Sequence, residues 1–140
     1  MRAFSLLEVI FVIIIFSILY TIISPSAISL LKDSLILKAK SQLATIRMGL
    51  DSAISKNILS HNYICPNLEG DDEESFFEGV LVKPIKNSSN IKWMLQKSSD
   101  SEDIYILKLG DEKVEIYYIK DFNRRCPLRC RGPICKELEI

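Results

Sequence analysis

The chain has 140 residues and a mass of 16.0 kDa, which is enough for one domain and leaves little length for a second. Eighteen Lys and Arg residues balance eighteen Asp and Glu residues, so the zero formal net charge argues against a protein drawn to nucleic acid or membranes by its overall field. Apolar residues make up 48% of the chain and are concentrated in residues 1–23. We therefore expect a membrane segment followed by one globular domain.

Residues Phe4 to Ile23 form an apolar run that few polar residues interrupt, FSLLEVIFVIIIFSILYTII. A helix of this length would span about 30 Å, the thickness of the hydrocarbon core of a bilayer. A lone strand cannot satisfy its backbone groups in lipid, so the run predicts a transmembrane helix over residues 4–23. The alternatives are a buried helix of a soluble domain, a cleaved secretory signal and a plain single-pass anchor.

Glu8 argues against the last two alternatives. A carboxylate at this depth costs on the order of 2–3 kcal/mol on insertion scales, and neither a signal nor a plain anchor requires one. If the chain is cut after Ala3, Phe4 becomes the N-terminus and carries an ammonium group, one helical turn from Glu8. We therefore expect Glu8 to neutralise this amine, in its own or a neighbouring subunit, and to set the register of an assembly.

Arg2-Ala3 followed by the residues FSLLEVI resembles the prepilin processing and N-methylation motif of type IV pilins and type II secretion pseudopilins. Pro25 matches the helix-kinking proline that is common in those families. The resemblance covers residues 1 to about 60 and is motif-specific over roughly the first 25. Two departures are a very short leader and Ala3 at a position where the family usually has Gly.

The resemblance implies that residues 1–3 are a leader peptide, that a prepilin peptidase cuts between Ala3 and Phe4, and that Phe4 is methylated. It further implies a structural subunit of a bacterial type IV pilus, a type II secretion pseudopilus or a related DNA-uptake filament. Such a subunit crosses the inner membrane once and assembles with homologous subunits. Its C-terminal domain lies in the periplasm or in an extracellular filament.

Beyond Pro25 the pattern becomes amphipathic. Proline removes a backbone donor and clashes with the preceding turn, so we expect a kink or a short melted segment near residues 24–26. Apolar residues then recur every three or four positions and predict an amphipathic helix over residues 24–62. We expect residues 26 to about 40 to contact neighbouring subunits and the rest of the stripe to pack on the domain's own sheet. The stripe consists of Ile28, Leu31, Leu35, Ala39, Leu43, Ile46, Leu50, Ile54 and Ile58.

The remainder, residues 63–140, predicts an extracytoplasmic, β-rich globular domain. Strand signals cover residues 79–85, 91–96, 104–109 and 113–120. The whole chain is therefore α+β, with a long N-terminal helix, half transmembrane and half amphipathic, packed on a small antiparallel sheet of about four strands. The last element is a cysteine-rich C-terminal tail.

A hairpin turn at residues 110–113 is expected to join the last two of these strands. It would pair Leu109 with Val114 and Leu107 with Ile116. Lys108 would then lie opposite Glu115, which is a favourable pair of charges.

Four cysteines follow the apolar run, and an even number outside the cytoplasm indicates two disulfides. We favour Cys65–Cys126 with Cys130–Cys135, and the nearest rival pairs Cys65 with Cys130 and Cys126 with Cys135. A four-cysteine zinc site is the alternative, but the spacing lacks the usual close CxxC pair.

Two charged segments have alternative interpretations. Residues 69–78 contain six acids and no base, which could form a calcium loop, although a solvated loop is commoner. The tail is basic and could contact DNA or a secreted cargo if the chain is a minor tip subunit. We favour a solvated basic loop, or one that meets the acidic segment. The arginines of the tail are Arg124, Arg125, Arg129 and Arg131.

Nothing in the sequence predicts catalysis. The only histidine, His61, is expected at the end of the amphipathic helix and has no chemical role there. Motifs for a serine nucleophile, for a metal-binding helix and for cradling phosphates are absent from the sequence. We expect no enzymatic activity, no cofactor and no metal.

Overall fold

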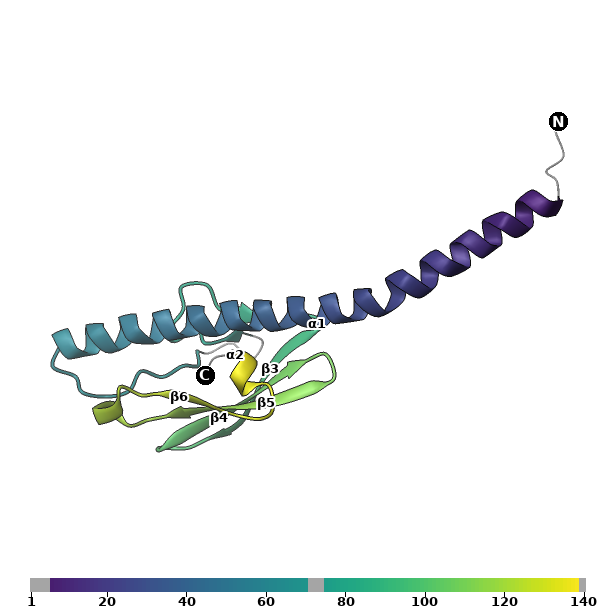
Figure 1. Ribbon diagram of the computed structural model, residues 1–140. Helices are drawn as coiled ribbons and strands as arrows, with labels where there is room; N and C mark the ends of the chain where they lie inside the picture. Colours follow the sequence, from purple (N-terminus) through teal and green to yellow (C-terminus); the bar gives the residue numbers. More distant parts are fainter. Residues whose placement is uncertain (1–5, 71–74, 139–140) are drawn as a thin grey trace. The chain divides into compact units, whose positions relative to one another are not determined.

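The computed structural model describes residues 6–70 and 75–138, except for the side chains of residues 22–29. The chain forms two compact units, residues 1–34 and residues 35–140, which are described separately below. The helical and strand elements are shown in Figure 1. In chain order they are α1 (Leu6–Leu59), β1 (Ser75–Phe76), β2 (Ile85–Lys86), β3 (Ile91–Ser98), β4 (Glu102–Leu109), β5 (Glu112–Ile119), the 3-10 helix η1 (Phe122–Arg124), β6 (Leu128–Arg131) and α2 (Cys135–Leu138).

The first unit is the N-terminal part of α1. We expected either a kink or a short melted segment at residues 24–26. The backbone stays helical there, so the helix does not melt. A proline removes a single backbone donor, and a helix can continue past that loss. The expected kink is attributed to the ring of Pro25, and this side chain lies outside the described ones. Among the residues that the structure describes, no helix combines the length and the apolar character needed to cross a membrane.

The second unit is a four-stranded antiparallel sheet in the order β3-β4-β5-β6, with the C-terminal half of α1 lying along one face (Figure 1). A separate two-stranded ribbon pairs β1 with β2. This arrangement confirms the α+β class, the long helix and an antiparallel sheet of four strands.

The predicted apolar stripe of α1 forms one wall of the core. Its buried members follow the helical period, because side chains three or four positions apart share a face. They are Ala39, Leu43, Ile46, Leu50 and Ile54. Leu35 packs partly against the core as well, whereas Leu31 is exposed. The domain therefore covers the helix from Leu35 onward, about one turn earlier than expected.

Alternate residues of β3, β4 and β5 form the opposite wall. A hydrogen bond joins the two walls, since Trp93 Nε1 on β3 donates to Gln42 Oε1 on α1 at 3.0 Å. The ring of Phe77 packs edge-on against Trp93, with 4.9 Å between ring centroids. The buried strand residues are Ile91, Trp93, Tyr105, Leu107, Leu109, Val114, Ile116 and Tyr118.

The strand expected at residues 79–85 is wrong except at its end, where Ile85 opens β2. The backbone turns instead, because the amides of Val80 and Leu81 both donate to Phe77 O. This turn lies against α1 at Gly49, where an added Cβ would lie 2.6 Å from Val80 O. Close approach of the turn thus explains a glycine within a long helix.

The β4–β5 hairpin forms with a register two residues away from the expected one. Its connection is the two-residue loop Gly110-Asp111, in which Gly110 adopts a φ of 58° that glycine accepts at little cost. Leu107 therefore pairs with Val114, and Lys108 lies opposite Lys113. A shift of two residues keeps every side chain on its expected face, so the core prediction survives the error.

Four short elements were not predicted. One of them is the 3-10 helix η1, which follows β5. The tail contributes β6, which pairs with β5 and completes the sheet, and it ends in the short helix α2. Strand β1 begins inside the segment that we expected to be an acidic loop. Helix α1 ends at Leu59, three residues before the predicted end, with backbone turns at Ser60, His61 and Asn62.

Candidate functional site

The N-terminal unit exposes apolar side chains on all sides of the helix. Every apolar side chain from Leu6 to Tyr20 is between 47% and 78% exposed. Soluble monomers rarely expose contiguous apolar surface on this scale, and such a surface marks a site that another apolar body covers. The residues are Leu6, Leu7, Val9, Ile10, Phe11, Val12, Ile13, Ile14, Ile15, Phe16, Ile18, Leu19 and Tyr20.

Ser17 and Thr21 satisfy their hydroxyl groups within the helix itself. Ser17 Oγ donates to Ile13 O and Thr21 Oγ1 donates to Ile18 O, both at 2.8 Å. Such bonds remove the need for water, which suits a helix in apolar surroundings.

Glu8 is the only carboxylate of the apolar run, and it lies exposed in the first turn of α1. The positive end of the helix dipole favours a negative side chain at this position. The positions expected for processing and methylation, Ala3 and Phe4, lie outside the described residues. The expected contact between Glu8 and the Phe4 amine is therefore not described either.

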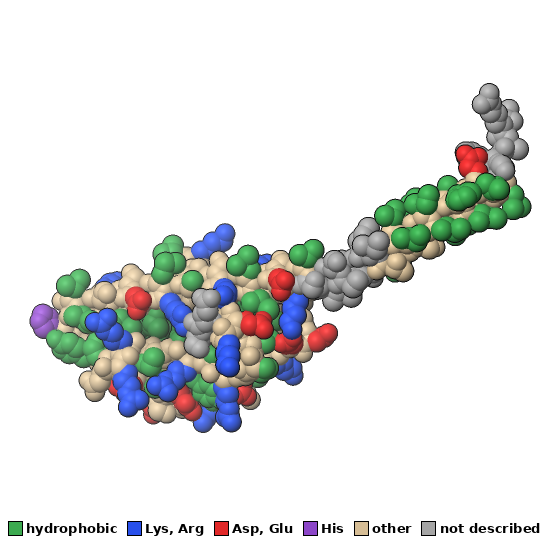
Figure 2. Space-filling view, viewed as in Figure 1, with side chains coloured by type: hydrophobic (Ala, Val, Ile, Leu, Met, Phe, Trp, Pro, Cys, Tyr) green, Lys and Arg blue, Asp and Glu red, His purple; other side chains and the backbone are tan. Residues whose placement is uncertain are grey.

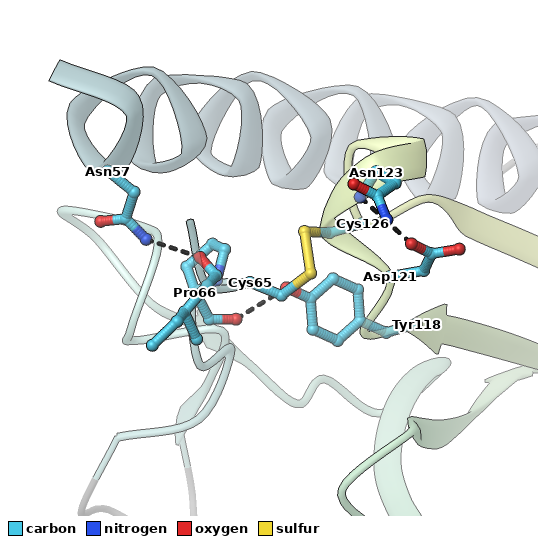
Figure 3. The surroundings of a disulfide bond; sticks show 8 residues. Asn57, Cys65, Pro66, Tyr118, Asp121, Asn123 and Cys126 are labelled. Atoms are coloured by element: carbon cyan, nitrogen blue, oxygen red, sulfur yellow. Dashed lines mark hydrogen bonds between the residues drawn. A yellow bond between two sulfur atoms is a disulfide. The ribbon is translucent and has the colours of Figure 1, made fainter. Parts of the chain in front are cut away.

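The disulfide between Cys65 and Cys126 joins the segment after α1 to the segment after β5 (Figure 3). Hydrogen bonds hold the same segment on both sides of the sulfur bridge. Asn57 Nδ2 on α1 donates to Ile64 O at 2.9 Å, and the Tyr118 hydroxyl on β5 donates to Pro66 O at 2.7 Å. The bridge thus fastens the end of the helix to the sheet.

A capped 3-10 helix and two residues with left-handed backbone angles position Cys126 for this disulfide. Asp121 caps η1 through its side chain, which accepts from the backbone amide of Asn123 at 3.1 Å. The two residues that follow η1, Arg125 and Cys126, both have left-handed backbone angles, with φ of 58° and 48°. The chain reverses there and enters β6.

The second disulfide joins Cys130 on β6 to Cys135 at the start of α2. Both pairs are the ones that the sequence favoured, and the rival pairing is wrong. All four sulfurs are oxidised, so none is available as a zinc ligand. Residues 71–74 of the acidic segment, on which the choice between a calcium loop and a solvated loop depends, lie outside the described residues.

The structure does not bring the four tail arginines together. Arg124 lies on η1, where its Nε is 3.3 Å from Asp121 Oδ2. Arg125 lines a cavity of about 250 Å³ between α1 and the start of β6, together with Asp51 and Leu128. Arg129 and Arg131 are exposed on β6.

Strand pairing places Arg129 and Arg131 on the face of the sheet that points away from α1, which we call the outer face. Arg131 pairs with Glu115, and Arg129 pairs with Tyr117. On the same face Lys92, Lys108 and Lys113 form a row across β3, β4 and β5. The alternating pattern shows that these residues face solvent, but only the register shows that they are neighbours, so this cluster was missed.

A buried polar cluster lies on the inner face of the sheet, the face that α1 covers. Asp103 is 2% exposed and is held by Lys120 Nζ at 2.8 Å and by the Ser98 hydroxyl at 2.7 Å. Burial raises the pKa of the nearby Glu69 carboxyl, and Asp103 acts in the same direction. Burial also raises the pKa of the Tyr105 hydroxyl. Within the described part of the chain, neither Glu69 Oε1 nor the Tyr105 hydroxyl has a hydrogen-bond partner.

Comparison of the chain with protein-family models, with curated proteins and with solved structures found no match.

Proposed function

We propose that the chain is a pilin-like or pseudopilin subunit, a structural protein that polymerises into a type IV pilus, a secretion pseudopilus or a related DNA-uptake filament. The observation that carries the proposal is the helix from Leu6 to Tyr20, which is apolar on every side and carries one carboxylate in its first turn. A helix of this kind needs an apolar cover, and a filament core of equivalent helices supplies one.

The energetics favour burial of this segment, first in lipid and then among neighbouring helices. Covering one large apolar side chain gains roughly 1.5–3 kcal/mol, so an uncovered segment is strongly disfavoured in water. Lipid covers it in the free subunit, and neighbouring helices cover it after assembly. The apolar run extends over residues 4–23 of the sequence, and the described side chains account for residues 6–21 of it.

Glu8 makes assembly more favourable than remaining in lipid. The hydroxyls of Ser17 and Thr21 are already satisfied within the helix, so they gain nothing from a partner subunit. A carboxylate in lipid is costly unless a cation lies beside it. The ammonium group of a processed Phe4, on a neighbouring subunit, would be such a cation.

The C-terminal domain is suited to an oxidising compartment. Its two disulfides fasten the helix end, the sheet and the tail into one body. Disulfides persist outside the cytoplasm, which agrees with a domain in the periplasm or in an extracellular filament. In this proposal the inner membrane holds the helix, and a prepilin peptidase removes residues 1–3.

Replacing Glu8 by Leu tests the proposal, with Ser17→Leu as the matched control in the same helix. We expect both variants to enter the membrane, since each becomes more apolar. Filaments sheared from cells should decrease at least tenfold for Glu8→Leu, because the neighbour's amine loses its partner. Ser17→Leu should assemble within about twofold of the parent chain. Normal assembly of the Glu8 variant would remove the role assigned to this carboxylate.

A further inference from the structure

The outer face of the sheet collects positive charge, although the whole chain has a net charge of zero. Strand register brings six basic side chains to this face against two acidic ones. Placement rather than composition therefore creates the local field. Figure 2 shows Lys and Arg side chains, with some Asp and Glu side chains among them, along the lower border of the domain, where the sheet lies in Figure 1. The basic residues are Lys92, Lys97, Lys108, Lys113, Arg129 and Arg131, and the acidic ones are Glu102 and Glu115.

The row of Lys92, Lys108 and Lys113 is unfavourable for folding. Neighbouring strands lie about 4.8 Å apart, and like charges directly opposite each other in a sheet repel. Within the described residues none of these three lysines takes part in an ion pair, and Lys92 and Lys113 are exposed. An arrangement that costs stability and remains open to solvent is suited to an anionic ligand.

An apolar strip lies beside this row, in the two rows of the sheet that end at Arg131 and Arg129 on β6, and Glu115 interrupts the first of these two rows. Ile106 lies opposite Met94, and Ile104 lies opposite Tyr117 in the next row of the sheet. Met94 is 43% exposed, and the other three side chains are half-buried. The Tyr117 hydroxyl donates to Glu115 Oε2 at 2.6 Å, which fixes the ring on the face.

From this juxtaposition we infer that the outer face binds single-stranded nucleic acid, whichever of the proposed filaments the chain builds. The lysine row and the two arginines contact phosphates, while exposed bases lie on the apolar strip and on the Tyr117 ring. Proteins that bind single strands combine these two features, a basic track for the backbone and an aromatic or apolar surface for the bases. A duplex hides its bases from such a strip and gains only the charge contacts. The other two tail arginines take no part, since Arg124 lies beside Asp121 and Arg125 lies toward α1.

The test uses the full chain in non-ionic detergent and a fluorescein-labelled 20-nucleotide DNA strand of mixed sequence, with binding followed by anisotropy. The lysine variant replaces Lys92, Lys108 and Lys113 by Gln. The matched control replaces Lys56, Lys83 and Lys136 by Gln, three exposed lysines elsewhere that change the net charge equally. Thermal unfolding of both variants checks that they are folded.

We expect the lysine variant to bind at least tenfold more weakly at low salt, and the control within threefold of the parent. The slope of log affinity against log salt should fall by about 2, because three phosphate contacts are lost. Tyr117→Leu should reduce the preference for the single strand over a duplex of equal length.

Three outcomes would overturn the inference. They are no binding by the parent chain, an equal loss in the lysine variant and its control, and tighter binding to an acidic peptide or to vesicles of anionic phospholipid than to the DNA strand. None of them bears on assembly through Glu8, so the two proposals fail independently.

Discussion

Glu69 lies half-buried beside the Tyr105 hydroxyl, and burial raises the pKa of its carboxyl. The folded state therefore binds this proton more tightly than the unfolded chain does. The contribution of Glu69 to stability is fully present below the pKa of the unfolded chain, and it is lost as the pH rises through the folded pKa.

Replacing Glu69 by Gln removes the titration and keeps the shape of the side chain. We expect this variant to be more stable than the parent at pH 7 by less than about 1 kcal/mol, because the charge that it removes is only partly buried and solvent screens it. The gain should shrink as the pH falls toward 4. Urea unfolding at several pH values measures this, with the exposed Glu137→Gln as control. Parallel pH profiles for the Glu69 variant and the parent would contradict the assignment.

At the scale of an element, Gly49 decides how closely the turn at Val80 approaches α1. Alanine at this position would favour the helix by about 1 kcal/mol. Its Cβ would, however, lie 2.6 Å from Val80 O and 2.7 Å from Leu81 Cδ2, so the turn would have to move.

We expect Gly49→Ala to lower the free energy of unfolding by about 1–2 kcal/mol, since overpacking outweighs the gain in propensity. Ser52→Ala, at an exposed position of the same helix, should change it by less than 0.5 kcal/mol. Chemical denaturation of both variants makes the comparison. A stabilised Gly49 variant would show that the contact with the turn is loose.

The two disulfides should differ in their effect, because they close loops of different length. The sulfurs of Cys65–Cys126 join residues 61 positions apart, and those of Cys130–Cys135 join residues 5 apart. On the chain-entropy model, replacing the first pair by Ala costs about 4 kcal/mol and replacing the second about 2 kcal/mol. Unfolding of the two double variants in urea measures both losses. Equal losses would mean that chain entropy is not what separates them.

Residue patterns were sufficient to predict which side chains form the core, but not the register in which the strands pair. The spacing of the apolar stripe from Ala39 to Ile54 and the alternation around Leu107 and Ile116 depend on local periodicity, which the sequence displays directly. The hairpin register depends on one choice of turn, and the two-residue loop at Gly110-Asp111 moved every pair by two positions.

The basic outer face was missed for the same reason. Lys92, Lys108 and Lys113 are far apart in the sequence and become neighbours only through strand pairing. Strand β6 was missed because three cysteines and an arginine-rich composition made the tail resemble a loop. Its four residues carry too few apolar positions to show an alternation.

At the scale of the whole molecule, the chain consists of an apolar segment that other apolar groups must bury and a domain that buries its own core. The segment is apolar on all sides, whereas the domain has its own core and two disulfides. A filament subunit requires this division, because the helices form the shared core and the domains remain outside it.

Intact-mass measurement of the protein extracted from native membranes tests the central claim most directly. We expect a single chain that begins at Phe4, carries one N-terminal methyl group and two disulfides, and retains the whole apolar helix. A mature chain that begins near Ala27 would identify residues 1–26 as an ordinary signal peptide. That result would contradict the filament function, because no apolar segment would remain for assembly.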